Sequence, residues 1–147
     1  MSEEILKVQN LKKYFPIRTG LLKHQPLRAV DDISFDVRPG ETVGLVGESG
    51  SGKTTAGLCI LRLIEPTAGQ IIFDGEDLTG ADFNRMQAVR QRLQIVFQDP
   101  LDSLNPRMTV SEAVAEPLRL HGLVNGRQAD ERVLDLFRRV SLGPEHI

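Results

Sequence analysis

The segment Gly47-Glu-Ser-Gly-Ser-Gly-Lys-Thr54 decides the fold, because it matches G-x-x-x-x-G-K-[ST] at every fixed position. A short apolar run, Thr42-Val-Gly-Leu-Val46, precedes it and predicts a buried strand. An apolar stretch over residues 55–64 follows and predicts a buried helix that stops before Pro66. A glycine-rich loop between a buried strand and a helix is the context of a phosphate-binding loop. We therefore expect a nucleoside triphosphate site for ATP with magnesium.

Each residue type in this loop has a physical task. Triphosphate oxygens must meet backbone N–H groups at close range, and a Cβ at Gly50 or Gly52 would obstruct that approach. Successive N–H groups form an anion-binding nest, and the next helix presents its positive end. We expect Lys53 to reach the β- and γ-phosphates, Thr54 to ligate magnesium and Thr55 to donate to the α-phosphate. The candidate nucleotide-binding residues of the loop are Gly47, Glu48, Ser49, Gly50, Ser51, Gly52, Lys53, Thr54 and Thr55.

The composition fits a soluble globular protein. The 147 residues are 40% hydrophobic and 26% charged, and 18 basic against 20 acidic residues give a net charge of −2. That balance supplies no bulk attraction for nucleic acid or anionic lipid, so we expect no nucleic-acid partner. The N-terminus lacks a secretory signal, and no stretch reaches the ~20 apolar residues that span a bilayer. The single cysteine, Cys59, suits a reducing cytoplasm.

The remaining pattern predicts an α/β fold followed by helices. Alternating apolar residues predict strands over 5–11, 28–37 and 70–73, and a further strand over 93–97. A helix is expected over 82–92, a turn at Asp74-Gly75 and a loop over 16–26.

Beyond Pro100 the sequence predicts helices only. Thr109-Val-Ser-Glu112 has capping-box spacing ahead of a helix toward Leu120, which we expect Pro117 to kink or break. Residues with helical spacing predict a second helix; they are Val133, Leu134, Phe137 and Val140. We divide the chain into an α/β core over 1–99 and a partial helical subdomain over 100–147.

Several stretches resemble the ATPase subunits of ABC transporters. They are Ser34–Thr55, Pro66–Gly75 and Val96-Phe-Gln-Asp-Pro100, the last of which is similar to that family's Q-loop. Leu101–Val110, Glu48 and the insertion over 16–26 resemble the oligopeptide and dipeptide importer group. The resemblance implies a P-loop NTPase core with an N-terminal antiparallel β region and the start of a helical subdomain, in a truncated chain.

The resemblance also implies further site residues. Gln98 matches the glutamine that contacts magnesium and the attacking water, so Lys53 and Gln98 are the catalytic candidates, and Thr54 and Gln98 the magnesium candidates. Tyr14, with Phe15 as second choice, matches the aromatic residue on which adenine stacks. The residues alone favour Gln98 as a plain surface polar residue at a strand end, and the two aromatics could pack in the core.

Three family features have no counterpart in the 147 residues: the Leu-Ser-Gly-Gly-Gln signature, the apolar strand ending in Asp-Glu, and the switch histidine. The simplest interpretation is truncation inside the helical subdomain. We expect the apolar residues of 43–46 and 95–97 to be uncovered, the 147-residue chain to be poorly stable, and ATP to bind without significant turnover.

The resemblance implies an ATP-binding, energy-coupling subunit of an ABC importer for peptides or related small solutes. Its implied partners are a second ATPase subunit, transmembrane permease subunits that contact the segment after Gln98, and, indirectly, an extracytoplasmic solute-binding protein. The implied location is the cytoplasmic face of the cell membrane. The transported solute stays open among dipeptides, oligopeptides, nickel and related cargoes.

Two other functions compete with this one. A P-loop GTPase switch would use a D-x-x-G segment, which Asp77-Leu-Thr-Gly80 matches, but no N-K-x-D guanine-reading motif occurs. The segment also fits a turn after the strand over 70–73. The other alternative is a non-catalytic nucleotide-binding fragment that regulates a partner.

Overall fold

The computed structural model describes residues 4–18, 24–98, 104–125 and 127–143 of the chain. They belong to two compact units, residues 1–94 and residues 95–147. The first unit contains the phosphate-binding loop and the second is helical.

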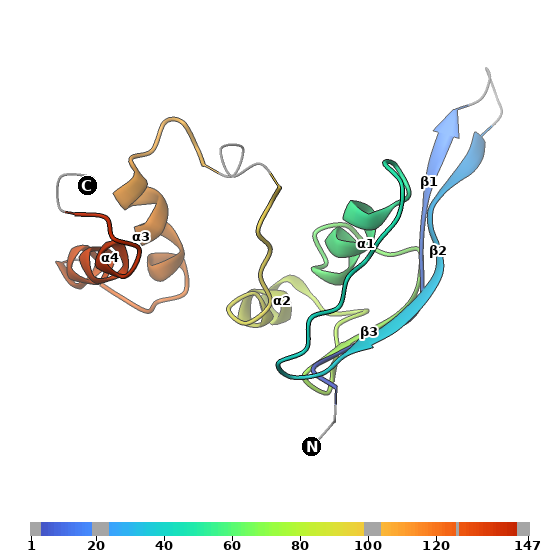
Figure 1. Ribbon diagram of the computed structural model, residues 1–147, viewed down its shortest axis with the longest axis horizontal. Coiled ribbons are helices and arrows are strands. Elements are labelled where there is room, and N and C mark those ends of the chain that lie inside the picture. Colours follow the sequence, from blue (N-terminus) through green and yellow to red (C-terminus); the bar gives the residue numbers. More distant parts are fainter. Residues whose placement is uncertain (1–3, 19–23, 99–103, 126, 144–147) are drawn as a thin grey trace. The chain divides into compact units, whose positions relative to one another are not determined.

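The first unit is built on a four-stranded antiparallel sheet in the order β2-β1-β3-β4 (Figure 1). The strands are β1 (Leu6–Arg18), β2 (His24–Val37), β3 (Ala68–Phe73) and β4 (Glu76–Asp77). This sheet is the antiparallel β region that the family resemblance implies.

The loop expected over residues 16–26 is wrong in part, because β1 and β2 extend into it. In the register of this pair, Pro16 lies opposite Pro26 and Arg18 lies opposite His24. Beyond Lys12 the described part of β1 pairs with β2 only, and β2 is an edge strand. A proline that cannot donate to a ladder is tolerated at such a free edge. Strand pairing therefore continues past both prolines.

The turn expected at Asp74-Gly75 is confirmed. Phe73 pairs with Glu76 across it, so the loop between β3 and β4 has two residues. Both loop residues have positive φ, 52° at Asp74 and 79° at Gly75. This is the geometry of a two-residue hairpin turn, whose twist matches that of the flanking strands.

Two helices belong to the first unit, and both are shorter than expected. Helix α1 (Lys53–Ile60) ends four residues early, because Arg62 takes a left-handed φ of 53° and the N–H of Leu63 donates to the carbonyl of Leu58. That bond is the six-to-one bond of a Schellman cap. Helix α2 (Phe83–Val89) begins after Asp82, whose side chain accepts from the N–H of Arg85.

The core of this unit lies between the sheet and its two helices, which cover the same face (Figure 1). Its buried residues are Val8, Leu11, Val30, Ala56, Cys59, Ile71, Phe73, Leu78, Met86 and Val89.

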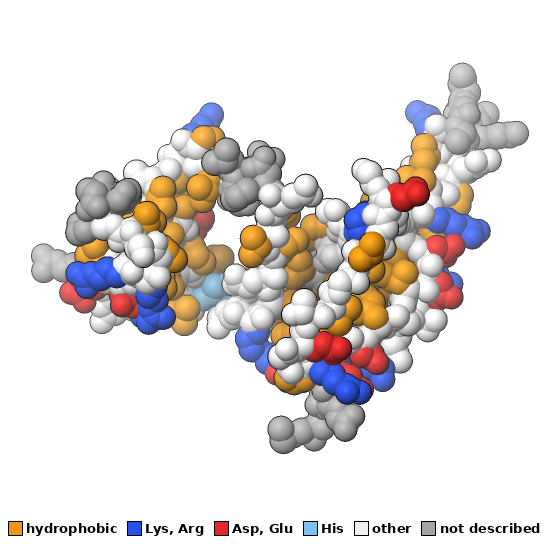
Figure 2. Space-filling model, in the orientation of Figure 1, with side chains coloured by type: hydrophobic (Ala, Val, Ile, Leu, Met, Phe, Trp, Pro, Cys, Tyr) orange, Lys and Arg blue, Asp and Glu red, His pale blue; other side chains and the backbone are white. Residues whose placement is uncertain are grey.

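The strands expected over 42–46 and 93–97 are wrong, since the structure assigns no strand to either segment. A buried strand needs neighbours that take up its N–H and C=O groups, and no described strand pairs with these residues. Their apolar side chains are uncovered, as we expected: Val46 and Val96 are each 94% exposed. Figure 2 shows apolar side chains at the surface of the first unit.

The second unit consists of α3 (Val110–Leu120) and α4 (Arg127–Arg139), which pack through Ala115, Val133 and Phe137. The predicted capping box is confirmed by bonds between Thr109 and Glu112 in both directions. Among the residues described, no helix has the length and apolarity that crossing a membrane requires.

Pro117 lies within α3, which is one helix throughout, so it does not break the helix, and a kink there stays a prediction. A proline removes one intrahelical donor, and the capping box together with packing against α4 stabilises the remaining helix. The expectation for Val140 is wrong, because it follows the end of α4 and is 65% exposed and so does not share the buried face.

Candidate nucleotide site

The glycines of the phosphate-binding loop have backbone conformations that side chains rarely adopt. Gly50 has φ 81°, and Gly52, the N-cap of α1, has φ 93°. A Cβ on Gly52 would lie 1.9 Å from the carbonyl oxygen of Ala29 on β2, and one on Gly47 would lie 2.6 Å from the hydroxyl of Ser51. The motif therefore needs glycine for backbone conformation and for close approach as well as for phosphate access.

Lys53 lies folded over this loop. Its Nζ donates to the carbonyl of Gly47 at 2.8 Å, to the carbonyl of Glu48 at 2.6 Å and to the hydroxyl of Ser51 at 3.3 Å. The ammonium group is thus held at the loop by neutral oxygens in the part of the chain that the structure describes. An anionic phosphate is a stronger acceptor for an ammonium group than these neutral oxygens, so it can replace them.

The start of α1 is free of competing acidic groups. Gly52 supplies no side-chain cap, and the first turn contains no acidic residue. The N–H groups of that turn, which belong to Lys53, Thr54 and Thr55, therefore have no side-chain acceptor at the N-cap. A helix start in this state attracts anions through its N–H groups and its dipole.

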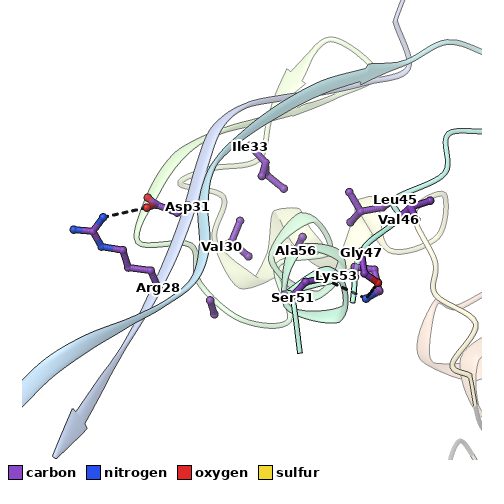
Figure 3. Close-up of a pocket in the computed structure, with 12 residues that line it drawn as sticks. Arg28, Val30, Asp31, Ile33, Leu45, Val46, Gly47, Ser51, Lys53 and Ala56 are labelled. Carbon is purple, nitrogen blue, oxygen red and sulfur yellow. Dashed lines mark hydrogen bonds and ion pairs between the residues drawn. The ribbon is translucent and has the colours of Figure 1, made fainter. Parts of the chain in front are cut away.

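Two cavities flank the loop on the side of the β1–β2 hairpin. A cavity of about 380 Å³ lies between β2 and the loop, with Val30, Ile33, Leu45 and Lys53 in its wall (Figure 3). A second cavity of about 300 Å³ has Phe15, Leu27, Arg28 and Ala29 on the hairpin side. Its opposite wall consists of loop and α1 residues Gly50, Gly52, Lys53, Thr54 and Thr55. The cavity therefore places the side chains of Phe15 and Leu27 opposite the candidate phosphate-binding residues.

Phe15, rather than Tyr14, faces this second cavity. Successive residues of a strand point to opposite faces, and Phe15 lines the cavity together with Leu27, its partner across the strand pair. Tyr14 lines neither of the two cavities. Its hydroxyl donates to Asp31, which points away from Ser51 and Lys53 in Figure 3.

Tyr14, Asp31 and Arg28 form a small cluster, of which Asp31 and Arg28 also line the first cavity. Arg28 donates to Asp31 at 3.2 Å, and its guanidinium lies 5.7 Å from the centre of the Tyr14 ring. The hydrogen bond to Asp31 raises the pKa of Tyr14 above its ordinary value. The same bond, helped by Arg28, holds the pKa of Asp31 below its ordinary value. The cluster fixes the Tyr14 ring in place by its own contacts.

The other candidate, Gln98, is exposed and belongs to the second unit. Its contact with magnesium and water stays a prediction. Of the segment after Gln98 that we expect to face a permease, residues 99–103 lie outside the described residues.

Asp77 of the D-x-x-G segment closes a local turn. Its carboxylate accepts from the N–H of Thr79 at 2.8 Å and from the side-chain amide of Gln70 at 2.6 Å. The hydroxyl of Thr79 accepts from the N–H of Ile71 at 3.0 Å. Bonds from Thr79 and Gln70 hold the pKa of Asp77 below its ordinary value. These contacts explain the segment as a turn and leave the GTPase alternative without support.

The structure also adds site residues that we did not predict. Leu27 and Ala29 lie on β2, which pairs with β1 beside Phe15. Leu27 contributes an apolar side chain to the cavity wall, and the backbone carbonyl of Ala29 contacts Gly52. The period-two pattern of β2 is present in the sequence, but it does not tell which loop the strand packs against.

Comparisons with known proteins identify the family of the chain. The family model described as ABC transporter matches residues 30–146. The chain is 49% identical over 146 residues to the glutathione import ATP-binding protein GsiA of Escherichia coli strain K12, and 48% identical to that of Shigella boydii serotype 4. In each case the match covers 98% of this chain and 23% of the relative.

Two similar solved structures are of the ABC transporter cassette MJ0796. One is a dimer, with a TM-score of 0.77 and 25% identity over 96% of this chain and 59% of that one. The other is a post-hydrolysis state bound to ADP and Pi, with a TM-score of 0.74 and 25% identity over 97% and 62% of the two chains.

The fold and the loop at Gly47–Thr54 define a P-loop nucleotide-binding protein. The chain belongs to the ABC transporter family, whose model matches most of its length. It spans about a quarter of the length of the curated relatives that it matches.

Proposed function

We propose that this chain is the ATP-binding, energy-coupling part of an ABC importer for glutathione, short peptides or similar small solutes. The observation that carries the proposal is the arrangement of Lys53 over the glycine-rich loop at the start of α1, beside a cavity with an aromatic wall. The names of the relatives, which describe ATP-binding proteins of glutathione import, support the cargo class.

The phosphate half of ATP would occupy the loop. Backbone N–H groups from Gly47 to Thr55 would bind the phosphate oxygens, and Lys53 would neutralise charge on the β- and γ-phosphates. The Thr54 hydroxyl would ligate magnesium, a hard cation that prefers oxygen. Gln98 would help to place the attacking water. In such sites catalysis is positioning and charge stabilisation, and magnesium supplies further neutralisation of the transferring phosphoryl group.

The base would stack on Phe15. Phe15 is in the wall of the cavity that also contains Gly50 and Thr54, whereas Tyr14 lines neither cavity and its hydroxyl is bonded to Asp31. We therefore propose the second-choice aromatic residue, Phe15, in preference to Tyr14.

The partners belong to the same proposal. A second ATPase subunit would complete the nucleotide site, in line with the dimer formed by the MJ0796 cassette. Permease subunits would contact the helical part, residues 100–147, while residues 1–99 would hold ATP. A solute-binding protein would act outside the membrane, with this chain on the inner face.

Uptake in cells tests this function. Lys53→Ala in the chromosomal gene should abolish accumulation of the transported cargo when labelled glutathione, a labelled dipeptide and nickel are supplied in turn. Lys7→Ala, a lysine on β1 that is absent from both cavity walls, is the matched control. If Lys53→Ala leaves the uptake of all three unchanged, the importer assignment is wrong.

A further inference from the structure

Lys13 contacts Phe15, which is in the wall of the second cavity. Its Nζ donates to the backbone carbonyl of Glu65 at 2.7 Å and lies 4.9 Å from the centre of the Phe15 ring. The register of β1 against β2 shifts on both sides of Lys13, between Leu11 and Lys13 and between Lys13 and Tyr14. Such irregularities bend a strand and redirect its side chains.

Phe15 takes part in two contacts that bear on the site. It belongs to the lining of the cavity, which does not include Lys13, and the ammonium group of Lys13 lies over its ring. A cation over an aromatic face is attracted by the negative charge of the π-system. The ring that borders the cavity is therefore also held by a cation.

Lys13 also links this ring to the phosphate-binding helix. Glu65 belongs to the segment that joins α1 to β3. That segment is tied to β1 at neighbouring residues as well: the N–H of Thr67 donates to the carbonyl of Lys12 at 2.7 Å, and its hydroxyl accepts from the N–H of Tyr14 at 2.9 Å. Lys13 adds a further bond to this segment, from its Nζ to the carbonyl of Glu65. The same ammonium group contacts the Phe15 ring.

We propose that Lys13 is a positioning residue of the nucleotide site, which holds the Phe15 ring in place for the base and acts on the nucleoside half of ATP and not on its phosphates. This inference rests on the proposed function. Lys13 and Lys53 would therefore act on different parts of ATP, because Lys53 is bonded to the loop that would bind the phosphates.

The size of the effect follows from the strength of the contact. A cation over a ring at a partly exposed site contributes roughly 0.5–1 kcal/mol, which is about a two- to fivefold change in affinity. Loss of the lysine charge should therefore weaken ATP binding by about two- to fivefold. Inorganic tripolyphosphate has no base, so its affinity should stay the same.

Calorimetric titration of the whole 147-residue chain with Mg·ATP and with Mg·tripolyphosphate tests this inference. Lys13→Gln removes the charge and retains an amide that can donate to Glu65, while Lys13→Arg retains the cation. Lys12→Gln removes the same charge from the adjacent residue, whose ammonium lies 3.8 Å from Asp32. We expect Lys13→Gln to lower the ATP affinity only, and Lys13→Arg and Lys12→Gln to match the wild type for both ligands.

The same titrations distinguish the ways in which the inference can fail. Equal loss of ATP and tripolyphosphate affinity in Lys13→Gln would overturn it, because a general structural or electrostatic effect acts on both ligands. A wild type that binds neither ligand contradicts the proposed function instead. As a second check, the ATP effect of Lys13→Gln should vanish in a Phe15→Leu background, and its persistence there would also overturn the inference. Should Lys13→Gln lose the wild-type circular dichroism, Lys13→Met replaces it under the same criteria.

Discussion

Gly52 and Ala29 are in direct backbone contact: a Cβ on Gly52 would lie 1.9 Å from the carbonyl oxygen of Ala29. This contact joins the start of α1 to β2. Because β2 pairs with β1, it also fixes where Phe15 and Leu27 lie relative to the phosphate-binding loop. One glycine thus connects the two halves of the nucleotide site.

Gly52→Ala should therefore abolish nucleotide binding. The new methyl group has no room beside Ala29, and the backbone at φ 93° disfavours any side chain. Gly57→Ala is the matched control, since a Cβ there meets nothing within 4 Å. An alanine inside a helix should stabilise the chain by roughly 0.5–1 kcal/mol. Thermal melts and Mg·ATP titrations measure both effects, and normal ATP affinity in Gly52→Ala would show that the contact is dispensable.

Phe15 and Tyr14 should differ in their effect on ATP binding. Stacking of a base on an aromatic side chain contributes roughly 1–3 kcal/mol, so Phe15→Ala should weaken Mg·ATP by about five- to 150-fold. Tyr14→Ala, which removes a ring that lines neither cavity, should leave the affinity close to that of the wild type. Equilibrium titration of the two variants decides between the residues. A larger loss of Mg·ATP affinity in the Tyr14 variant than in the Phe15 variant would assign base stacking to Tyr14.

The capping box of α3 should make the helical unit sensitive to acid. The N–H of Thr109 donates to the carboxylate of Glu112 at 2.8 Å, and this bond, followed by that of the Thr109 hydroxyl, holds the pKa of Glu112 below its ordinary value. A lowered pKa in the folded state means that the stabilisation is complete above the ordinary pKa of about 4.5 and is lost as the pH falls through the lowered value.

Glu112→Gln tests this dependence, because glutamine retains an acceptor without the charge. The variant should be less stable than the wild type at pH 7, and the two should converge as the pH falls through the lowered pKa of Glu112. Helicity followed by far-UV circular dichroism during heating measures the difference. Glu116→Gln, one turn further along α3, is the control for a general charge effect. A difference that persists unchanged at low pH would show that the charge of Glu112 does not stabilise the cap.

The sequence predicts those features that are specified by residues adjacent in the chain. It fails for features that depend on pairing with a distant segment. The loop from Gly47 to Thr54, the capping box and the turn at Asp74-Gly75 are each specified by neighbouring residues, so pattern alone identifies them. The segments 42–46 and 93–97 have the composition of strands, but a strand forms only beside another strand, and none of the described strands pairs with them.

The choice between Tyr14 and Phe15 shows the same limit. Both are aromatic residues near the end of the first strand, and the pattern of residues cannot say which face of β1 meets the loop. The bulges around Lys13 set the direction of each side chain, and they depend on the pairing of β1 with β2. The wall formed by Leu27 and Ala29 is likewise visible only in the folded chain.

The most direct test of a nucleotide site at Lys53 is calorimetric titration of Mg·ATP into the wild-type chain and into Lys53→Ala. We expect saturable binding of one ATP per chain by the wild type. Loss of charged hydrogen bonds, at roughly 1.5–3 kcal/mol, should weaken binding by the variant by about ten- to 150-fold. Equal affinity of the two proteins, or no binding by a wild type with native circular dichroism, would contradict the assignment.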